Sequence, residues 1–178
     1  MTKTFSVDIC GRMEQLPILK LPSGMSIAFF NLHGNQELTE FCGKEIAKRL
    51  EGAEVVITAE SKGLQLAHVV ARELDHKFYA VARKSKKLYM QDGISATVKS
   101  ITTAGEQTLY LSAHDAALIK DKRVAIVDDV VSTGGSLSGL RQLVENAGGV
   151  VFKQAFVLAE GDAANRDDLI YLAKIPLL

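Results

Sequence analysis

The stretch RVAIVDDVVSTGGSL, residues 123–137, places four apolar residues directly before two adjacent carboxylates, Asp128 and Asp129. A short, mostly β-branched run without polar alternation is typical of a strand that is buried on both faces of a parallel sheet. The two acids then lie at the carboxyl end of that strand, which is the edge where open α/β sheets bind ligands. We therefore expect an α/β fold with a ligand site at this position.

Small and hydroxylated residues follow the acids: Ser132, Thr133, Gly134, Gly135 and Ser136. A helix that begins in this loop has first-turn N–H groups without intrahelical partners, and these groups favour an anion. The segment thus offers acceptors for sugar hydroxyls and a cradle for a phosphate. A plain strand-to-helix turn with two surface acids would explain an isolated Asp-Asp or Gly-Gly pair, but it does not explain the whole ordered series.

Length and composition indicate one domain. The chain has 178 residues, of which 47% are hydrophobic and 24% charged, and a chain of about 150 residues already buries roughly two-thirds of its unfolded surface. The 21 basic and 21 acidic residues cancel, so no nucleic acid is expected as a partner. The N-terminus does not resemble a signal peptide, and no apolar run approaches the about 18 residues of a spanning helix. We expect a cytoplasmic protein without a membrane partner.

The cysteine content indicates neither a disulfide framework nor a zinc site. Cys10 and Cys42 lack the close Cys or His neighbours that zinc requires. Both are therefore expected to be reduced and buried thiols.

A second loop is predicted at the same edge of the sheet. Residues 54–59 (EVVITA) form a short apolar run, and helical spacing over 64–74 and another strand at 78–82 complete a βαβ unit, which implies a parallel sheet. The turn between strand and helix, residues 60–63 (ESKG), offers backbone N–H groups and Lys62 to an anion. Taken alone, such a turn is more often a simple bend.

A basic run and a hairpin follow. Residues 83–87 (RKSKK) carry four positive charges in a neutral chain. A solvated face is the usual explanation of such a run, but its place after a strand of the same sheet favours anion binding. Residues 96–103 and 107–112 are β-prone and are joined at Ala104-Gly105-Glu106, which indicates a hairpin. We interpret residues 85–112 as a candidate lid.

The remaining helices, strands and loops are predicted from hydrophobic periodicity and from turn residues. Helical spacing predicts helices over 36–50 and 136–147, the second ended by Gly148-Gly149. Residues 150–158 and 169–178 are expected as strands, the latter at an edge because of Pro176. Residues 160–168 are expected as a polar loop, and residues 1–34 as one or two strands with turns.

The ordered series at residues 123–137 resembles the motif that binds phosphoribosyl pyrophosphate (PRPP) in type I phosphoribosyltransferases: four apolar residues, two acids, two apolar residues and a Thr/Gly-rich loop. The likeness covers roughly residues 35–160. The stretches VARKSKKLYM and SATVKSITTAGEQTLYLS are most similar to adenine and xanthine phosphoribosyltransferases. The resemblance implies a central twisted parallel sheet flanked by helices, a flexible hairpin lid, and a small hood from roughly 1–34 and 160–178. It also implies Mg²⁺, a homodimer, and transfer of ribose 5-phosphate from PRPP to a purine N9 with release of pyrophosphate.

The resemblance also assigns roles to residues. Asp128 and Asp129 are the catalytic and metal-binding candidates, since they would hold the ribose 2- and 3-hydroxyls directly or through Mg²⁺. The 5-phosphate would be bound by Ser132, Thr133, Gly134, Gly135 and Ser136. The pyrophosphate would be bound by Glu60, Ser61, Lys62, Gly63, Arg83, Lys84 and Lys87. The base would stack near Phe29 and Phe30 with Asn31 as a hydrogen-bonding partner, although two adjacent Phe are also typical of a core.

Two departures from the family pattern leave the purine open. Adenine enzymes carry Glu-Tyr-Gly in the lid where this chain has Thr103-Ala104-Gly105, so that acid is missing unless Glu106 replaces it. Enzymes for 6-oxopurines place a lysine near the O6 atom, where this chain has Glu160-Gly161. An unpaired buried acceptor costs roughly 1–3 kcal/mol, so adenine is expected before xanthine.

Other functions are compatible with a PRPP site. One is a non-catalytic PRPP-binding transcriptional regulator, for which residues 1–34 are too short and insufficiently basic to form the usual winged-helix domain. Another is an orotate enzyme or a pyrophosphate-forming synthetase homologue, which the purine-type stretches disfavour.

Overall fold

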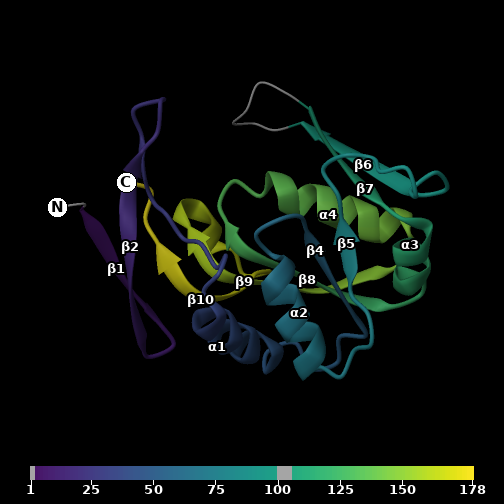
Figure 1. Cartoon of the computed structure of the whole chain (residues 1–178), viewed down its shortest axis with the longest axis horizontal. Helices are drawn as coiled ribbons and strands as arrows, with labels where there is room; N and C mark the ends of the chain where they lie inside the picture. The colour runs from purple at the N-terminus through teal and green to yellow at the C-terminus, as the bar shows by residue number, and fades with distance from the viewer. Residues whose placement is uncertain (1–2, 100–105) are drawn as a thin grey trace.

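A computed structural model of the chain describes residues 3–99 and 106–178 (Figure 1). The elements in chain order are β1 (Thr4–Ile9), β2 (Arg12–Lys20), β3 (Ser26–Ala28), α1 (Gln36–Ala47), β4 (Val55–Ala59), α2 (Leu64–Glu73), β5 (Ala80–Ala82), β6 (Ile94–Lys99), β7 (Glu106–Leu111), α3 (Ala113–Ile119), β8 (Arg123–Val131), α4 (Gly135–Asn146), β9 (Val150–Glu160), the 3₁₀ helix η1 (Gly161–Asn165) and β10 (Ile170–Ile175).

Five parallel strands form the main sheet in the order β10-β9-β8-β4-β5. The predicted α/β fold with a parallel sheet is confirmed. The apolar run before Asp128 forms β8, the middle strand, and residues 124–127 are fully buried, as expected for a strand covered on both faces. The edge position predicted from Pro176 is also confirmed, since β10 pairs with β9 alone within the described sheet.

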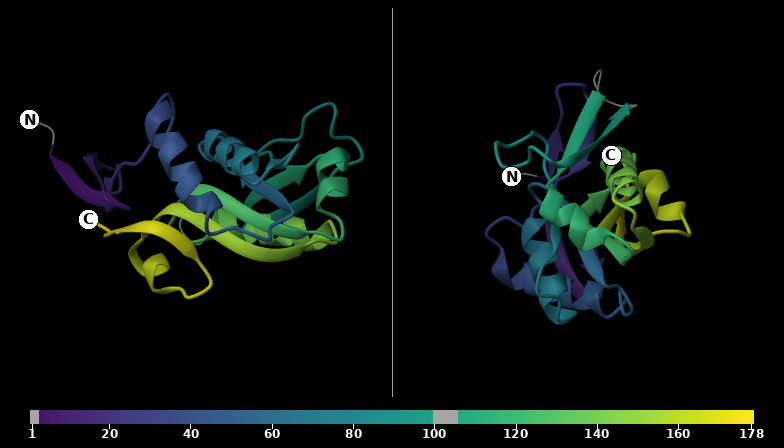
Figure 2. Two further views of the ribbon diagram at one scale, coloured as in Figure 1. Left: turned by 90° about the horizontal axis from the view of Figure 1, so that it is seen from below. Right: turned by 90° about the vertical axis from the view of Figure 1, so that its right-hand side faces the viewer.

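Helices cover both faces of the sheet, so that the core has two halves. Successive side chains of a strand point to opposite faces: Ala125 and Val127 of β8 pack in the half that contains α1 and α2, whereas Val124 and Ile126 pack in the half that contains α4. Figure 2 shows α1 and α2 together on one side of the sheet. Because all five strands are parallel, the loops that follow them lie at one edge of the sheet.

The N-terminal strands form a separate antiparallel sheet in the order β1-β2-β3. It lies at one end of the molecule beside β10 and the C-terminus (Figure 1). This small sheet lies within residues 1–34 of the expected hood, whereas β10, within its other expected part at residues 160–178, pairs in the main sheet. The C-terminal contribution to the small sheet is a hydrogen bond from the Ser26 N–H to the Leu178 carbonyl, 3.2 Å long.

The predicted hairpin is formed by β6 and β7, paired from Ile94–Leu111 to Lys99–Glu106. Its stalk packs on α4 (Figure 1), and Leu109 and Leu111 are fully buried. A Cβ atom at Gly139 of α4 would lie 2.9 Å from Leu109 Cδ1, so the absence of a side chain there allows the close packing. The stalk is thus part of the core, while the expected turn residues Ala104 and Gly105 lie outside the described residues.

Several local predictions need correction. The polar loop after β9 contains η1, and residues 113–119 form α3, a helix that the sequence reading did not include. The hydroxyl of Ser112 caps α3 by accepting a hydrogen bond from Asp115 N–H. Strand β5 begins at Ala80, where its pairing with β4 starts, and not at Phe78, which is half exposed. Cys42 is buried as expected, but Cys10 is exposed.

Within residues 3–99 and 106–178, none of the helices combines the length and the apolar character that crossing a membrane requires.

Candidate functional site

Three loops meet at the carboxyl edge of the main sheet. Lys62, in the turn after β4, approaches Asp129 of β8 with 3.3 Å between Nζ and Oδ2. Glu60, in the same turn, forms an ion pair with Arg83, with 2.6 Å between Oε2 and Nε. The turn after β4, the basic run after β5 and the end of β8 are therefore in contact, as their predicted positions in a parallel sheet require.

Glu60 organises the basic run. Its Oε1 atom accepts a 2.6 Å hydrogen bond from the Lys84 N–H, while its own N–H donates to the Ala82 carbonyl. This carboxylate is already paired with the Arg83 side chain and the Lys84 N–H, and its negative charge would repel pyrophosphate. Glu60 therefore suits the positioning of the basic run better than direct contact with an anion. The peptide bond between Glu60 and Ser61 is cis, and the side chain of Ser61 is exposed.

Gly63 is required by a close approach of backbone to side chains. A Cβ atom at this position would lie 2.3 Å from Thr58 Oγ1 and 2.5 Å from Asp128 Oδ1. Both distances are shorter than any van der Waals contact. The glycine therefore lets the first turn of α2 sit directly against the acid pair, so its predicted place in the site rests on a steric requirement.

The two acids share a poorly solvated environment. Asp129 is 5% exposed, and the Asp129 N–H donates a 2.9 Å hydrogen bond to Asp128 Oδ1. Burial and the neighbouring Asp129 charge raise the pKa of Asp128 to about 7, against smaller lowering effects of the hydrogen bond from the Asp129 N–H and of the charge of Lys84. A cation placed beside the two acids would relieve the repulsion between their carboxylates.

The loop after β8 forms a cavity of about 270 Å³, whose lining includes Asp128 and all of residues 130–137. Gly134 is the N-cap of α4 with φ of 81°, a left-handed conformation that suits glycine. No side chain caps this helix end among the described residues, and the residues of its first turn line the cavity. The five predicted phosphate-binding residues are thus gathered around one hollow.

Two further residues line this cavity that the sequence reading did not include: Gln107 of β7 and Phe156 of β9. Gln107 reaches the cavity because the hairpin packs on α4. Neither residue lies near Asp128 in the chain, and no local pattern distinguishes them from ordinary strand residues. Gln107 could be found from the sequence only by predicting how the hairpin docks, and Phe156 only from the register of β9 against β8, in which it is opposite Asp128.

The predicted cations are not all equivalent. Lys62, Arg83 and Lys84 are tied to the acid pair or to Glu60 by the contacts above. Lys87 instead donates a 2.7 Å hydrogen bond to Ser85 Oγ and lines a separate hollow with Lys86, Leu88 and Gln91. Its predicted role at the pyrophosphate has no supporting contact among the described residues.

The aromatic candidates for the base separate into two environments. Phe30 is 3% exposed and packs in the core, so its predicted stacking on a base is not possible in this structure. Phe29 is partly exposed and lies under Lys62, with 5.5 Å between Nζ and the ring centroid. Asn31 is exposed, and its Oδ1 accepts a 3.1 Å hydrogen bond from the His33 N–H. Of these three candidates, only Phe29 is linked to the acid pair by a described contact: Lys62 lies over its ring and also approaches Asp129.

The chemistry of the acid pair fits a magnesium ion that is shared with a substrate. The Oδ2 atom of Asp129 is buried and accepts no hydrogen bond from the described residues. These residues contain no group of three His, Cys, Asp or Glu side chains that could hold a metal. Mg²⁺ commonly uses one or two carboxylates and completes its coordination with water and substrate phosphates. Asp128 and Asp129 match that donor set.

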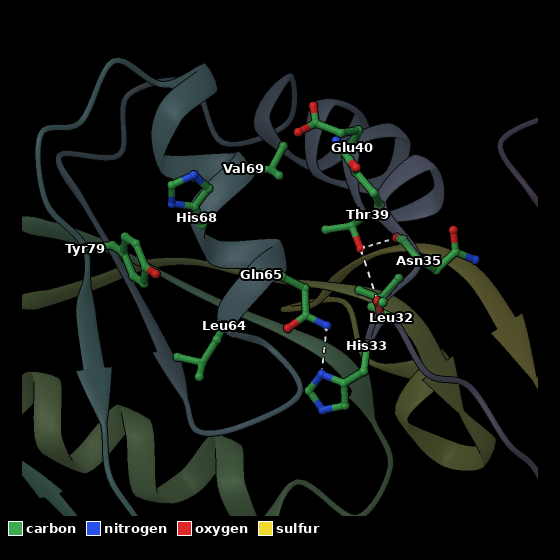
Figure 3. A pocket seen from close by; sticks show the side chains of 12 residues that line it. Leu32, His33, Asn35, Thr39, Glu40, Leu64, Gln65, His68, Val69 and Tyr79 are labelled. Carbon is green, nitrogen blue, oxygen red and sulfur yellow. Dashed lines mark hydrogen bonds between the residues drawn. The ribbon is translucent and has the colours of Figure 1, made fainter.

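A larger cavity of about 710 Å³ lies between the start of α1 and α2 (Figure 3). Gln65 of α2 and His33 before α1 are hydrogen-bonded there, with 3.2 Å between Nε2 and Nδ1. The described lining contains Glu40 but no Lys or Arg. A polyphosphate could not be neutralised in it, and the smaller cavity beside Asp128 is the better anion site.

Comparison with known proteins gives one family. Residues 32–172 match the family described as phosphoribosyl transferase domain. A xanthine phosphoribosyltransferase of Exiguobacterium sp. is 35% identical over 80% of this chain and 74% of its own length. An adenine phosphoribosyltransferase of Methanococcus maripaludis is 30% identical over 95% of this chain and 88% of its own length.

Solved structures agree on the fold. The adenine phosphoribosyltransferase of Thermoanaerobacter pseudethanolicus superposes with a TM-score of 0.75 at 22% identity, covering 90% of this chain and 95% of its own. That of Giardia lamblia, crystallised with 9-deazaadenine, gives 0.74 at 20% identity over 90% and 93%. The parallel sheet with a small accessory sheet is therefore a known arrangement.

Proposed function

The chain belongs to the phosphoribosyltransferase family, and we propose that it transfers ribose 5-phosphate from PRPP to a purine, adenine in preference to xanthine. The observation that carries the proposal is the position of Asp128 and Asp129, which lie between a cationic loop on one side and a phosphate cradle on the other. PRPP carries groups complementary to these in the same order, with an anionic pyrophosphate at C1, neutral hydroxyls at C2 and C3, and an anionic phosphate at C5.

The described contacts support the assignment of different loops to the two charged ends of PRPP. The N–H groups and hydroxyls of residues 132–136 would bind the 5-phosphate. Lys62, Arg83 and Lys84 would neutralise the pyrophosphate, with Glu60 holding Arg83 and the Lys84 backbone in place. Lys87 would join them only if its side chain left Ser85.

The acid pair suits the transition state of this transfer. A purine nitrogen forms a bond to C1 as the bond from C1 to the pyrophosphate oxygen breaks, and positive charge develops on the ribose ring while negative charge develops on the leaving group. The carboxylates of Asp128 and Asp129 would stabilise the ring, and the cations of the two loops would stabilise pyrophosphate. Preorganised charges in a buried site act more strongly than the same charges in water.

Magnesium is part of the proposal. Asp128 and Asp129 would hold the ion, directly or through water, together with oxygens of PRPP. Bound there, Mg²⁺ supplies positive charge that offsets the donor's phosphates and the repulsion within the acid pair.

The preference for adenine depends on Glu160. This residue ends β9 and is the N-cap of η1, and the sequence offers no lysine beside it for the O6 atom of a 6-oxopurine. A carboxylate there suits the amino group of adenine, which donates hydrogen bonds, better than a carbonyl oxygen. The relatives include both adenine and xanthine enzymes, so xanthine is the second candidate. Phe29 is the aromatic candidate beside the base.

The test is release of pyrophosphate from PRPP and Mg²⁺ with adenine, xanthine, hypoxanthine, guanine and orotate in parallel. We expect the highest kcat/KM with adenine. A higher value with xanthine would reverse the assignment of the base. No release with any of the five would contradict the proposed transfer.

The regulator hypothesis has no observation in its favour. Residues 3–34, as described, contain three strands and no helix, which excludes a winged-helix domain in that part of the chain. The homodimer and the cytoplasmic location stay predictions. Light scattering coupled to size-exclusion chromatography would test the first, and fractionation of the source cells the second.

A further inference from the structure

Arg166 lies outside the motif loop but approaches it closely. Its Nη1 atom is 3.4 Å from the point that a Cβ atom of Gly134 would occupy. Arg166 follows η1, in the connection from β9 to β10, so its nearness to the loop after β8 is a tertiary contact. Because Gly134 has no side chain, the guanidinium can lie directly against the loop that carries the predicted phosphate-binding residues.

Asp168 fixes the orientation of this guanidinium. The Nε and Nη2 atoms of Arg166 donate hydrogen bonds of 2.9 and 2.7 Å to Oδ1 and Oδ2 of Asp168. A guanidinium has five N–H donors, and this bidentate pairing uses one edge of it. The opposite edge, which includes Nη1, is directed away from Asp168 and remains available to a second anion.

Two side chains of other elements, the buried Gln154 and the partly exposed Arg141, hold Asp168 in turn. Gln154 of β9, 4% exposed, donates from Nε2 to Asp168 Oδ2 at 3.0 Å, and Arg141 of α4 approaches the same oxygen at 3.5 Å. Arg141 also donates to Gln154 Oε1. Two arginines thus share one carboxylate, and the cluster carries a net positive charge beside the first turn of α4.

We propose that Arg166 binds the 5-phosphate of the donor, together with the N–H groups of the loop, and that Asp168 is its positioning residue. The inference rests on the proposed function, because it needs PRPP as the ligand. A dianionic phosphate in a cradle of neutral N–H groups and hydroxyls gains a full countercharge from one guanidinium. Arg166 would also let the site reject ligands that lack a 5-phosphate.

Calorimetric binding to the full chain tests the role, with ribose 5-phosphate and Mg²⁺-pyrophosphate as separate probes of the two ends of the donor. We expect Arg166→Gln to weaken ribose 5-phosphate binding about 10- to 100-fold, which is typical for the loss of a hydrogen bond to a charged group. Pyrophosphate binding should stay unchanged, since its cations lie on other loops. Asp168→Asn should weaken ribose 5-phosphate binding to a smaller extent, because the guanidinium remains but is less well held.

Arg72→Gln is the matched control, since Arg72 is also a paired surface arginine, bound to Glu40 and Glu73 away from the cradle. It should bind both probes like the wild type. The inference is overturned if Arg166→Gln binds ribose 5-phosphate as tightly as the wild type, or if it loses both probes equally. Failure of the wild type to bind PRPP would instead overturn the proposed function, and the inference with it.

Discussion

The Nζ atom of Lys62 lies 3.3 Å from the Oδ2 atom of Asp129, across two loops of the sheet edge. Asp129 is nearly buried, and its Oδ2 receives no hydrogen bond from the described residues. Lys62 therefore supplies the nearest countercharge to this oxygen, while its side chain remains 44% exposed. The same cation is well placed to move to pyrophosphate when a ligand or Mg²⁺ takes over its place beside Asp129.

Replacing Lys62 by Met should affect both stability and binding. We expect the free energy of unfolding without ligand to fall by about 1 kcal/mol, since the lysine is half exposed and solvent screens part of its charge. Pyrophosphate affinity should fall about tenfold or more. Urea unfolding and calorimetry measure the two effects. Lys44→Met is the control, because Lys44 pairs with Glu40 at 3.9 Å on the surface, and it should change neither quantity appreciably.

Gly63→Ala tests the steric requirement at the start of α2. Its Cβ atom would overlap Thr58 Oγ1 and Asp128 Oδ1, so we expect a loss of about 1–3 kcal/mol of stability and weak PRPP binding. Gly135→Ala is the comparison for stability, since a Cβ atom there would have no neighbour within 4 Å. Equal thermal unfolding of the Gly63 and Gly135 variants would show that the loop adjusts without strain.

Asp128 should make the unliganded protein less stable as pH rises. Burial and the charge of Asp129 raise its pKa to about 7 from an ordinary value of 3.8. Between these values the folded chain holds more protons than the unfolded chain, so the free energy of unfolding decreases with increasing pH, by up to about 1.4 kcal/mol per pH unit. Urea unfolding at intervals from pH 5 to 8 should show this slope, and Asp128→Asn should flatten it.

Asp168 provides a control of opposite sign for that experiment. Its hydrogen bond from Arg166, together with that from Gln154, lowers its pKa to about 2. The stabilisation that it provides is present above the ordinary value of 3.8 and is lost only as pH falls toward 2. Asp168→Asn should therefore lower stability by the same amount at pH 5 and pH 8. An unchanged slope in Asp128→Asn would show that the acid pair is better solvated than the structure indicates.

The two thiols should differ sharply in reactivity. Burial raises the pKa of Cys42 to about 12, so almost no thiolate forms at pH 8 and reagent cannot reach it. Cys10 is exposed. Titration with a thiol-reactive chromogenic disulfide should modify one cysteine in the folded chain and both in urea. Cys10→Ser should abolish the folded-state reaction; a remaining fast reaction would mean that Cys42 is accessible.

The elements around the site could be predicted because their signals are local. The β-branched run before Asp128 forms β8, and the turn at residues 60–63 connects a strand to a helix as expected. Since parallel strands end at the same edge of a sheet, the predicted parallel pairing also placed the turn at residues 60–63, the basic run and the loop after β8 at one edge. Errors arose where tertiary packing decides: Phe30 and Phe29 are identical and adjacent, yet only Phe30 enters the core.

The sequence alone determined the α/β class, the elements from β4 to β5 and from β8 to β9, and the three loops proposed to bind an anion, because periodicity and turn residues act over a few neighbouring positions. The tertiary structure alone decided which side chains of those loops touch. Glu60 pairs with Arg83 instead of facing the ligand, Gln107 reaches the cradle through the docked hairpin, and Arg166 reaches Gly134 through a loop held by Asp168. These contacts join residues far apart in the chain, so they depend on how the sheet, α4 and the hairpin pack together.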